Sequence, residues 1–135
     1  MHCLLIEDNT ANAYLVEVLL TRRGHCVNVA RTGAEAVAMS RLQRFDVILI
    51  DLKLPDGDGC AFVPQLACGA WGGRPAPVIA VSAHALAADQ QRALDVGCRA
   101  FIEKPIDVAT FVDCVEGLAI ETEADCGAAR SAQEP

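Results

Sequence analysis

Polar residues that could act together in one site stand at the ends of short apolar runs in this sequence. They are Glu7, Asp8, Asp51, Ser82 and Lys104. Carboxylates that lie close together repel one another unless a cation neutralises their charge. A hard divalent ion suits such a group, and Mg²⁺ binds carboxylates together with water and phosphate oxygens. If the fold brings these residues together, they predict a site for Mg²⁺ and a phosphoryl group.

Asp51 has a special place in this set, because it ends the run VILI and is followed by the segment PDGDG. A carboxylate can attack phosphorus and form an aspartyl phosphate. Lys104 offers a positive charge to a phosphoryl oxygen, and the Ser82 hydroxyl can donate a hydrogen bond to another. Asp51 is therefore the candidate phosphate acceptor, and we expect PDGDG to form a flexible loop that leaves space above it.

The elements that must position these residues alternate between apolar runs and amphipathic segments. Strands are predicted at residues 3–7, 25–30, 46–51, 78–82 and 100–103, and helices at 10–23, 34–43, 59–69, 85–96 and 107–118. Apolar strands that alternate with helices indicate a parallel sheet covered on both faces, so the fold class is α/β, a doubly wound (βα)5 domain. In such sheets the ligand site lies at the carboxyl ends of the strands, where the polar residues stand.

Two segments depart from this regular pattern. The predicted helix near residues 59–69 contains Pro64, which is compatible with a helix only in its first turn. We therefore expect this helix to start late or to be kinked. Residues 121–135 are polar and rich in alanine and acids, so we expect a domain at residues 1–120 and a tail at 121–135 that does not pack.

Composition limits the classes of function. The chain has 135 residues, of which 53% are hydrophobic, enough for the core of one domain. A net charge of −7 with scattered basic residues argues against a nucleic-acid partner. Seven cysteines without a CxxC pair or a zinc-like spacing are expected to be mostly buried in a reducing cytosol. No run is long enough for a membrane span and no signal peptide is evident, so we expect a soluble, cytoplasmic protein.

Four stretches together carry a resemblance to a known family: LLIEDN, VILIDLKLPDGDG, PVIAVSA and FIEKP. In this order and spacing they resemble the receiver domain of two-component response regulators, over about residues 1–119. The resemblance implies a flavodoxin-like sheet with strand order 2-1-3-4-5. It also implies that Asp51 accepts a phosphoryl group, in a Mg²⁺-dependent manner, from a histidine kinase or a histidine phosphotransfer protein.

The same resemblance implies a role for each residue of the predicted site. The Mg²⁺ ligands are Glu7, Asp8, Asp51 and the backbone carbonyl of Lys53. Ser82 stands at the position of the switch hydroxyl, and Lys104 at that of the phosphate-binding lysine. The bond between Lys104 and Pro105 is expected to be cis.

Further positions are implied to tune the signal. Phe101 stands where an aromatic switch residue rotates inward, although its simplest interpretation is a core residue. Lys53 and His84, two residues beyond the acceptor and the switch hydroxyl, flank the path of water to the aspartyl phosphate. Lys53 carries only donors and its long stem can cover the phosphoryl group, so we expect slow self-dephosphorylation. The alternative is that Lys53 points into solvent.

Longer matches narrow the expected partners. EDNTAN and PVIAVSAHALAADQQRALDVGCRAFIEKPID resemble the receivers of phosphorelays and hybrid kinases. The expected partners are a kinase or phosphotransfer protein and a downstream protein target, with a possible homodimer through residues 85–96, 100–103 and 107–118. Because no output domain follows, we expect a stand-alone receiver that is a signalling domain and not an enzyme. An excised receiver of a hybrid kinase and a phosphorylation-independent scaffold stay open as alternatives.

Two rival classes fit the residues less well. A Mg²⁺-dependent phosphatase would need a second acid two residues after its nucleophile, and Lys53 stands there. A nucleotide-binding module would need a glycine-rich turn after the first strand, where the sequence has EDNTAN.

Overall fold

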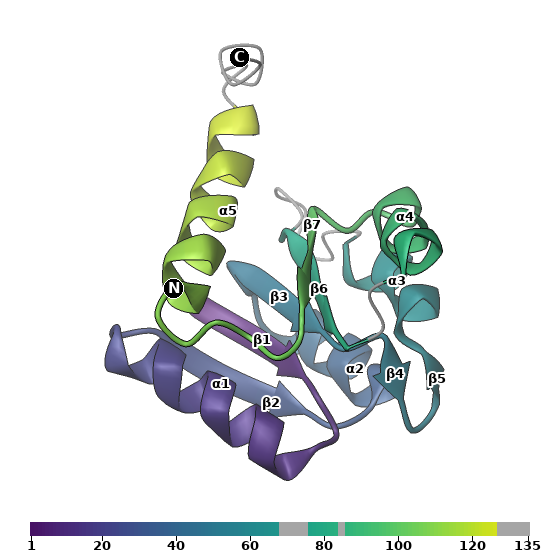
Figure 1. Cartoon of the computed structure of the whole chain (residues 1–135), viewed down its shortest axis with the longest axis horizontal. Helices are drawn as coiled ribbons and strands as arrows, with labels where there is room; N and C mark the ends of the chain where they lie inside the picture. The colour runs from purple at the N-terminus through teal and green to yellow at the C-terminus, as the bar shows by residue number, and fades with distance from the viewer. Residues whose placement is uncertain (68–75, 84–85, 127–135) are drawn as a thin grey trace.

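The chain is built around a parallel sheet of five strands, as the sequence predicts. A computed structural model describes residues 1–67, 76–83 and 86–126. The strands are β1 (His2–Ile6), β2 (Cys26–Ala30), β3 (Val47–Ile50), β6 (Val78–Ser82) and β7 (Ala100–Glu103). Their order across the sheet is β2-β1-β3-β6-β7, and every neighbouring pair is parallel (Figure 1). Counted along the chain, this is the predicted order 2-1-3-4-5.

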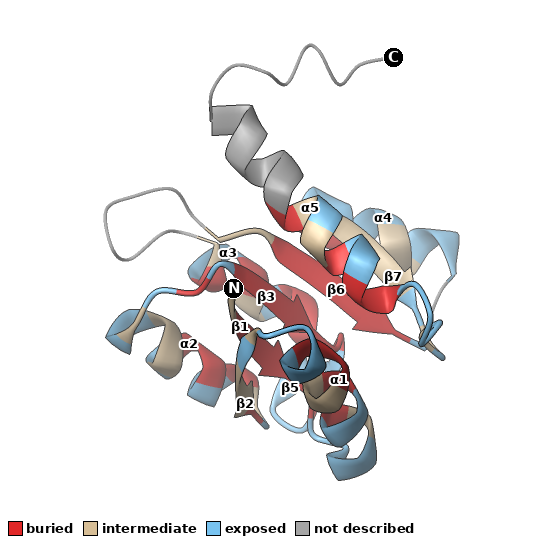
Figure 2. Cartoon of the chain, turned by 90° about the vertical axis from the view of Figure 1, so that its left-hand side faces the viewer, coloured by how far each residue is buried: buried red, intermediate tan, exposed pale blue. Residues whose placement is uncertain are grey.

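Helices cover both faces of the sheet because alternate strand residues point to opposite sides. Helices α1 (Thr10–Arg22) and α5 (Phe111–Cys126) pack on one face, against residues such as Leu5, Leu49 and Val81. Helices α2 (Gly33–Leu42), α3 (Val63–Leu66) and α4 (Ala87–Asp95) pack on the other, over the neighbouring residues of the same strands. Figure 2 shows the resulting buried strands between layers of half-exposed helices. The doubly wound α/β fold is therefore confirmed.

Two helices have bounds that differ from the prediction by more than two residues. The segment predicted as one helix near residues 59–69 is a 3₁₀ turn, η1 (Gly59–Phe62), followed by the short α3, with Pro64 in its first turn. This late start is the expected consequence of the proline; residues 68–69 lie outside the described residues. Helix α5 begins at Phe111 and not at 107, because the Asp107 carboxylate accepts the Ala109 N–H and holds a turn there.

Helix α5 also continues past its predicted end at residue 118. It runs to Cys126, so residues 121–126 of the predicted tail are helical. Neither a proline nor a helix-ending glycine turn stands between residues 118 and 126, and the next glycine is Gly127. The prediction for the rest of the tail, 127–135, lies outside the described residues.

The segment after Asp51 is a hairpin, which corrects the expectation of a flexible loop. Strands β4 (Lys53–Leu54) and β5 (Gly57–Asp58) pair antiparallel and form a second, two-stranded sheet. Gly57 has a φ of 134°, a conformation that only glycine adopts without strain. Strands of two residues are too short for a periodic pattern, so hydrophobic periodicity could not predict them.

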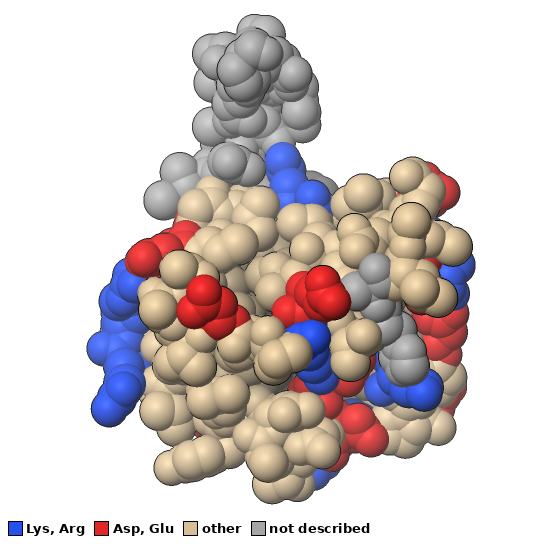
Figure 3. All heavy atoms as spheres, viewed as in Figure 1, with Lys and Arg blue, Asp and Glu red and all other residues tan. Residues whose placement is uncertain are grey.

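The described part of the face drawn in Figure 3 carries charges of both signs. The basic atoms lie in several separate groups, and some of these groups have acidic atoms beside them. Within the described ranges, none of the helices combines the length and the apolar character needed to cross a bilayer.

The cysteines are divided between core and surface. Cys3, Cys60 and Cys98 are buried, whereas Cys26 and Cys114 are exposed. Burial raises the pKa of the Cys3 thiol to about 11 and that of Cys98 to about 12, so both stay protonated at neutral pH. The prediction of mostly buried cysteines holds for these three; the side chains of Cys68 and Cys126 lie outside the described part.

Candidate functional site

The predicted site residues meet at the carboxyl edge of the main sheet. Glu7, Asp51 and Lys104 each follow the last residue of a strand, and the ladder of backbone hydrogen bonds continues through them. The Glu7 N–H donates to the Ala30 carbonyl (2.9 Å), and the Asp51 N–H donates to the Ile6 carbonyl (3.0 Å). The Lys104 N–H in turn donates to the Ser82 carbonyl (3.0 Å). The sheet thus fixes where the backbone of each of these residues lies.

Lys104 bridges two of the carboxylates. Its ammonium nitrogen lies 2.7 Å from Glu7 Oε1 and 3.0 Å from Asp51 Oδ2. The side chains are largely withdrawn from solvent, with 17% of Lys104, 5% of Glu7 and 11% of Asp51 exposed. At such burial an ion pair is much less screened by water and salt than one at the surface. The three side chains therefore form a single electrostatic unit.

The titration of this unit reflects competition between burial and charge. Burial raises the pKa of Glu7 above its ordinary value; the hydrogen bond from Lys104 opposes that rise and the charge of Asp51 adds to it. For Lys104, burial opposes the charged form, but hydrogen bonds to Glu7 and Asp51 outweigh it, and the pKa of Lys104 is raised. Lys104 therefore carries a fixed positive charge at neutral pH. Because Lys104 contacts two carboxylates, its single charge only partly compensates their combined negative charge.

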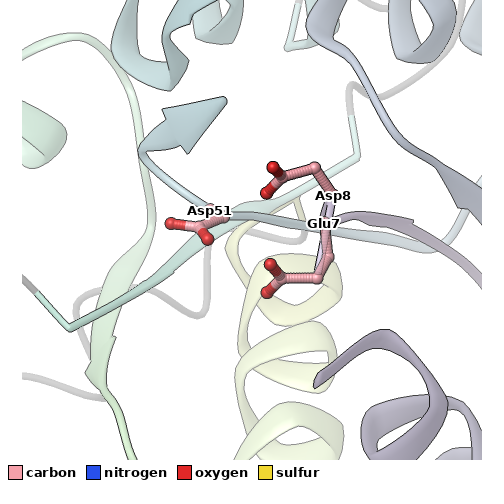
Figure 4. A group of neighbouring side chains, drawn as sticks. All are labelled: Glu7, Asp8 and Asp51. Atoms are coloured by element: carbon pink, nitrogen blue, oxygen red, sulfur yellow. The ribbon is translucent and has the colours of Figure 1, made fainter. Parts of the chain in front are cut away.

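Asp8 completes a cluster that fits a divalent cation. Glu7, Asp8 and Asp51 each offer an oxygen within 4.8 Å of the other two, and in Figure 4 the carboxylates project to the same side. Carboxylate oxygens are ligands that Mg²⁺ prefers, so these three residues would hold such an ion. Three negative charges against Lys104 leave an excess of two, which matches a divalent ion. Asp8 is exposed on the open side.

The backbone around Asp51 is tightly packed. The Lys53 N–H donates to Asp51 Oδ1 (3.1 Å), and the Gly59 N–H donates to the Leu52 carbonyl (2.7 Å). A Cβ on Gly59 would lie 2.5 Å from the Asp51 carbonyl oxygen and 2.9 Å from Leu52 Cα, so only glycine fits there. Gly59 was not predicted to have a role, although the glycines of PDGDG were a signal that a close backbone contact was possible.

The remaining predicted residues surround this centre. Ser82 is fully buried at the end of β6. Phe101 lies on β7, partly buried against the core under α2, α3 and α4, a placement in keeping with its simplest interpretation. Lys53 has an exposed side chain, and the bond between Lys104 and Pro105 is cis, as predicted. His84 lies outside the described residues.

A cavity of about 330 Å³ adjoins the acidic cluster and was not predicted. Glu7, Asp51 and Lys104 contribute to its wall, but most of its lining is apolar. Leu15 and Val16 come from α1, and Pro105 and Ile106 from the segment after β7. An apolar group could thus be held beside Asp51.

Comparison with known proteins agrees with this geometry. A family model for the response regulator receiver domain matches residues 3–116. The polar-differentiation response regulator DivK of Brucella anthropi is 35% identical over 113 residues, which cover 84% of this chain and 91% of that protein.

Solved structures give the same picture. A CheY-like receiver domain protein from Methanospirillum hungatei JF-1 has a TM-score of 0.82 at 26% identity, over 92% of this chain and 97% of that chain. The receiver domain of the sensor histidine kinase PA1611 from Pseudomonas aeruginosa PAO1 has a TM-score of 0.78 at 31% identity, over 87% and 96%. That structure holds a magnesium ion in its active site cleft. The flavodoxin-like fold predicted for this chain is therefore confirmed.

Proposed function

Because the chain belongs to the response regulator receiver domain family, we propose that it is a phospho-accepting receiver of a two-component phosphorelay. In this proposal Asp51 takes the phosphoryl group from a histidine kinase or a histidine phosphotransfer protein. One observation carries it: the Asp51 carboxylate lies 3.0 Å from the Lys104 ammonium, inside a cluster of three carboxylates. This arrangement offers a nucleophile, a cation for phosphoryl oxygens and a divalent-ion site together.

In the proposed transfer, a carboxylate oxygen of Asp51 attacks the phosphorus of a phosphohistidine on the donor protein. The new O–P bond forms as the P–N bond breaks, and the imidazole leaves with the electron pair and takes up a proton from water. The Lys104 ammonium neutralises charge on the phosphoryl oxygens, and the Ser82 hydroxyl donates a hydrogen bond to one of them. The protein contributes chiefly by fixing these groups in place before transfer.

Mg²⁺ is the proposed cofactor. Glu7, Asp8, Asp51 and the Lys53 carbonyl are the groups that would hold it. The bound ion supplies positive charge that offsets the repulsion between Asp51 and the incoming phosphoryl group. Glu7 is preorganised for this role, since Lys104 holds Oε1 and the Asn9 N–H donates to Oε2 (3.2 Å).

The signal is proposed to leave the site through Ser82 and Phe101. Movement of the buried hydroxyl toward the phosphoryl group would alter the packing of β6, and Phe101 lies on the neighbouring strand β7, with Ala80 as its partner in register. Lys53 and His84 are proposed to limit the access of water to the aspartyl phosphate, which gives a slowly decaying signal.

We propose that the protein acts in the cytoplasm through contacts with other proteins. The phosphoryl donor would bind at the site, and the downstream target would bind on the helices. We propose that the apolar cavity beside Asp51 receives a side chain of the phosphoryl donor. The proposed surface for a downstream target or a second copy is the face of α4, β7 and α5. An excised hybrid-kinase receiver is the second candidate, favoured by the 31% identity to the PA1611 receiver. A phosphorylation-independent scaffold is disfavoured because every site position carries a competent residue.

Labelling with acetyl phosphate and Mg²⁺ tests the proposal. Intact-mass measurement should find one added phosphoryl group on the wild type and none on Asp51→Asn, which lacks the nucleophile. Asp46→Asn, which changes an exposed acid at the opposite edge of the sheet, is the matched control and should label normally. Labelling of Asp51→Asn at the wild-type rate would refute Asp51 as acceptor, and an unlabelled wild type would favour the scaffold.

A further inference from the structure

The turn of the β4–β5 hairpin is tied to a helix that lies far away in the sequence. Asp56, between the two strands, accepts the Gly33 N–H at Oδ1 and the Ala34 N–H at Oδ2, both at 3.0 Å. These are the first two N–H groups of α2. Both carboxylate oxygens of an exposed side chain are thus used to hold one helix end to one turn.

Helix α2 already has a cap of its own. Thr32 is its N-cap residue and accepts the Glu35 N–H at 3.0 Å. A helix needs partners for its first N–H groups, but these usually come from the chain just before it. The Asp56 contact comes from a residue 22 and 23 positions away, so it joins two parts of the fold besides capping the helix.

The hairpin that Asp56 holds is the same one that positions the backbone beside the acceptor. Its first residue, Lys53, donates its N–H to Asp51 Oδ1, and Gly59, directly after the hairpin, packs against the Asp51 carbonyl. Lys53 pairs with Asp58, so the two ends of the hairpin cannot move independently. A displacement of the turn at Asp56 would therefore be passed to the backbone on both sides of Asp51.

The start of α2 is a firm anchor for this hairpin. Gly33 lies directly on the ring of Phe62, and a Cβ there would come within 2.3 Å of it. Phe62 belongs to η1, which follows the hairpin without a break. On the opposite side, the Asp58 carboxylate contacts Arg92 of α4 and accepts the Cys60 N–H at 3.0 Å. The hairpin is held from both flanks, and Asp56 links it to the N-terminus of α2.

We propose that Asp56 is a positioning residue for the phosphorylation site: by holding the hairpin of residues 53–58 to the first turn of α2, it fixes the backbone that Lys53 presents to the metal. The role deepens the proposed function and rests on it for the identity of the metal. Binding is reciprocal, so an ion held at the hairpin also steadies the first turn of α2. The N-terminal end of α2 thereby becomes a second place where occupancy of the site is sensed.

The test compares two cap residues on the same helix end. Asp56→Ala removes the link to the hairpin, whereas Thr32→Ala removes a cap of α2 and leaves that link intact. Asp56→Asn keeps one accepting oxygen and serves as the milder variant. Amide hydrogen exchange, measured by NMR without metal, reports on the hairpin, and titration with Mg²⁺ followed by amide chemical shifts reports on the site.

Faster exchange at the Lys53 and Gly59 amides is expected in Asp56→Ala, with a Kd for Mg²⁺ raised about tenfold, as is typical when a residue that orients metal ligands is removed. Thr32→Ala should affect exchange only around Glu35 and leave the Kd unchanged. Asp56→Asn should fall between wild type and Asp56→Ala. Hairpin exchange or Mg²⁺ affinity that is equal in Asp56→Ala and Thr32→Ala would overturn the positioning role.

Failure of the proposed function has a different signature. A wild type that binds no Mg²⁺ and takes no phosphoryl group from acetyl phosphate would contradict the function assigned to Asp51. The exchange comparison without metal would still decide whether Asp56 holds the hairpin, because it needs no ligand. Addition of Mg²⁺ should slow exchange of the Gly33 and Ala34 amides in both wild type and Thr32→Ala, because both keep the contacts to Asp56. Loss of this effect in Thr32→Ala would count against the specific link through Asp56.

Discussion

Two clusters of charged side chains lie at opposite ends of the sheet, and they are built differently. The site cluster, defined as Glu7, Asp8, Asp51 and Lys104, stands at the carboxyl ends of the strands. The distal cluster consists of Arg23, His25, Asp113 and Glu116, and joins the end of α1 to α5. In the distal cluster Arg23 lies 2.8 Å from Glu116 and 2.5 Å from Asp113, and His25 Nε2 lies 2.6 Å from Glu116.

Burial and charge balance separate the two clusters. Arg23 is 45% exposed and Asp113 66%, whereas Lys104 and Glu7 are nearly covered. In the distal cluster Arg23 contacts both acids, but the site has three acids and one lysine. Largely exposed ion pairs contribute little to stability and need no ligand. A buried excess of negative charge is costly and is relieved by a cation, which is why we propose that the site cluster, and not the distal one, carries the function.

Removal of Lys104 should have the largest effect. In Lys104→Met the phosphoryl oxygens lose their fixed cation, and phosphorylation by acetyl phosphate should slow about 100-fold, the usual loss when one preorganised charge donor is removed. Quenched time courses followed by intact mass measure the rate. Lys104→Arg keeps the positive charge and should recover part of the wild-type phosphorylation rate. A rate for Lys104→Met within twofold of wild type, a difference of about 0.4 kcal/mol in the activation barrier, would contradict the functional distinction between the two clusters.

Lys53 should affect how long the phosphoryl group survives. If its exposed stem covers the aspartyl phosphate, Lys53→Asn should make the phosphorylated protein decay several-fold faster, because water gains access and an acceptor that can orient it. Decay is measured after removal of acetyl phosphate. Lys53→Arg, with a similar cationic stem, is the control and should decay slowly. Equal decay in all proteins would mean that Lys53 simply extends into solvent.

Glu7 should make the stability of the metal-free protein depend on pH. Its pKa is raised on folding, chiefly by burial, so the folded state favours the protonated form. The associated stability is present below the ordinary pKa of about 4.3 and is lost as the pH rises through the raised value. Glu7→Gln avoids that loss and should be more stable than wild type near neutral pH without Mg²⁺.

Urea unfolding at two pH values measures this difference. The advantage of Glu7→Gln should shrink toward about pH 4, where wild-type Glu7 is protonated as well. Addition of Mg²⁺ should reverse the order near neutral pH, because the ion stabilises the folded wild type by binding its carboxylates. An advantage that stays constant across pH would point to a packing effect and not to charge.

The distal cluster should give the smallest effect. Glu116→Gln weakens the contacts to Arg23 and His25, and the free energy of unfolding should fall by about 0.5 kcal/mol, as for other partly exposed ion pairs. High salt should narrow the difference, and the phosphorylation rate should not change. A substantial loss of phosphorylation would show that the two ends of the sheet are coupled and would contradict the comparison drawn above.

The sequence by itself determined the parts of this protein that depend on local pattern. Apolar runs that alternate with amphipathic segments specified the strands and most helices, and β6 and β7 have the predicted bounds. Parallel strands place their carboxyl ends at one edge, so residues such as Glu7, Asp51 and Lys104 could be placed together before any distance was known. The pattern of apolar and amphipathic segments predicted the parallel sheet, and the sheet predicted that polar residues far apart in the chain would meet.

Only the tertiary structure decided how that site is held. The hairpin of residues 53–58 is too short for any periodic signal, and Asp56 in the sequence looks like an ordinary turn acid. Its partners Gly33 and Ala34, like the contact between Arg23 and Glu116 across 93 positions, depend on the packing of whole helices against the sheet. Long-range contacts of exposed polar side chains leave no mark in local composition, because many neighbouring residues could satisfy the same backbone groups or charges.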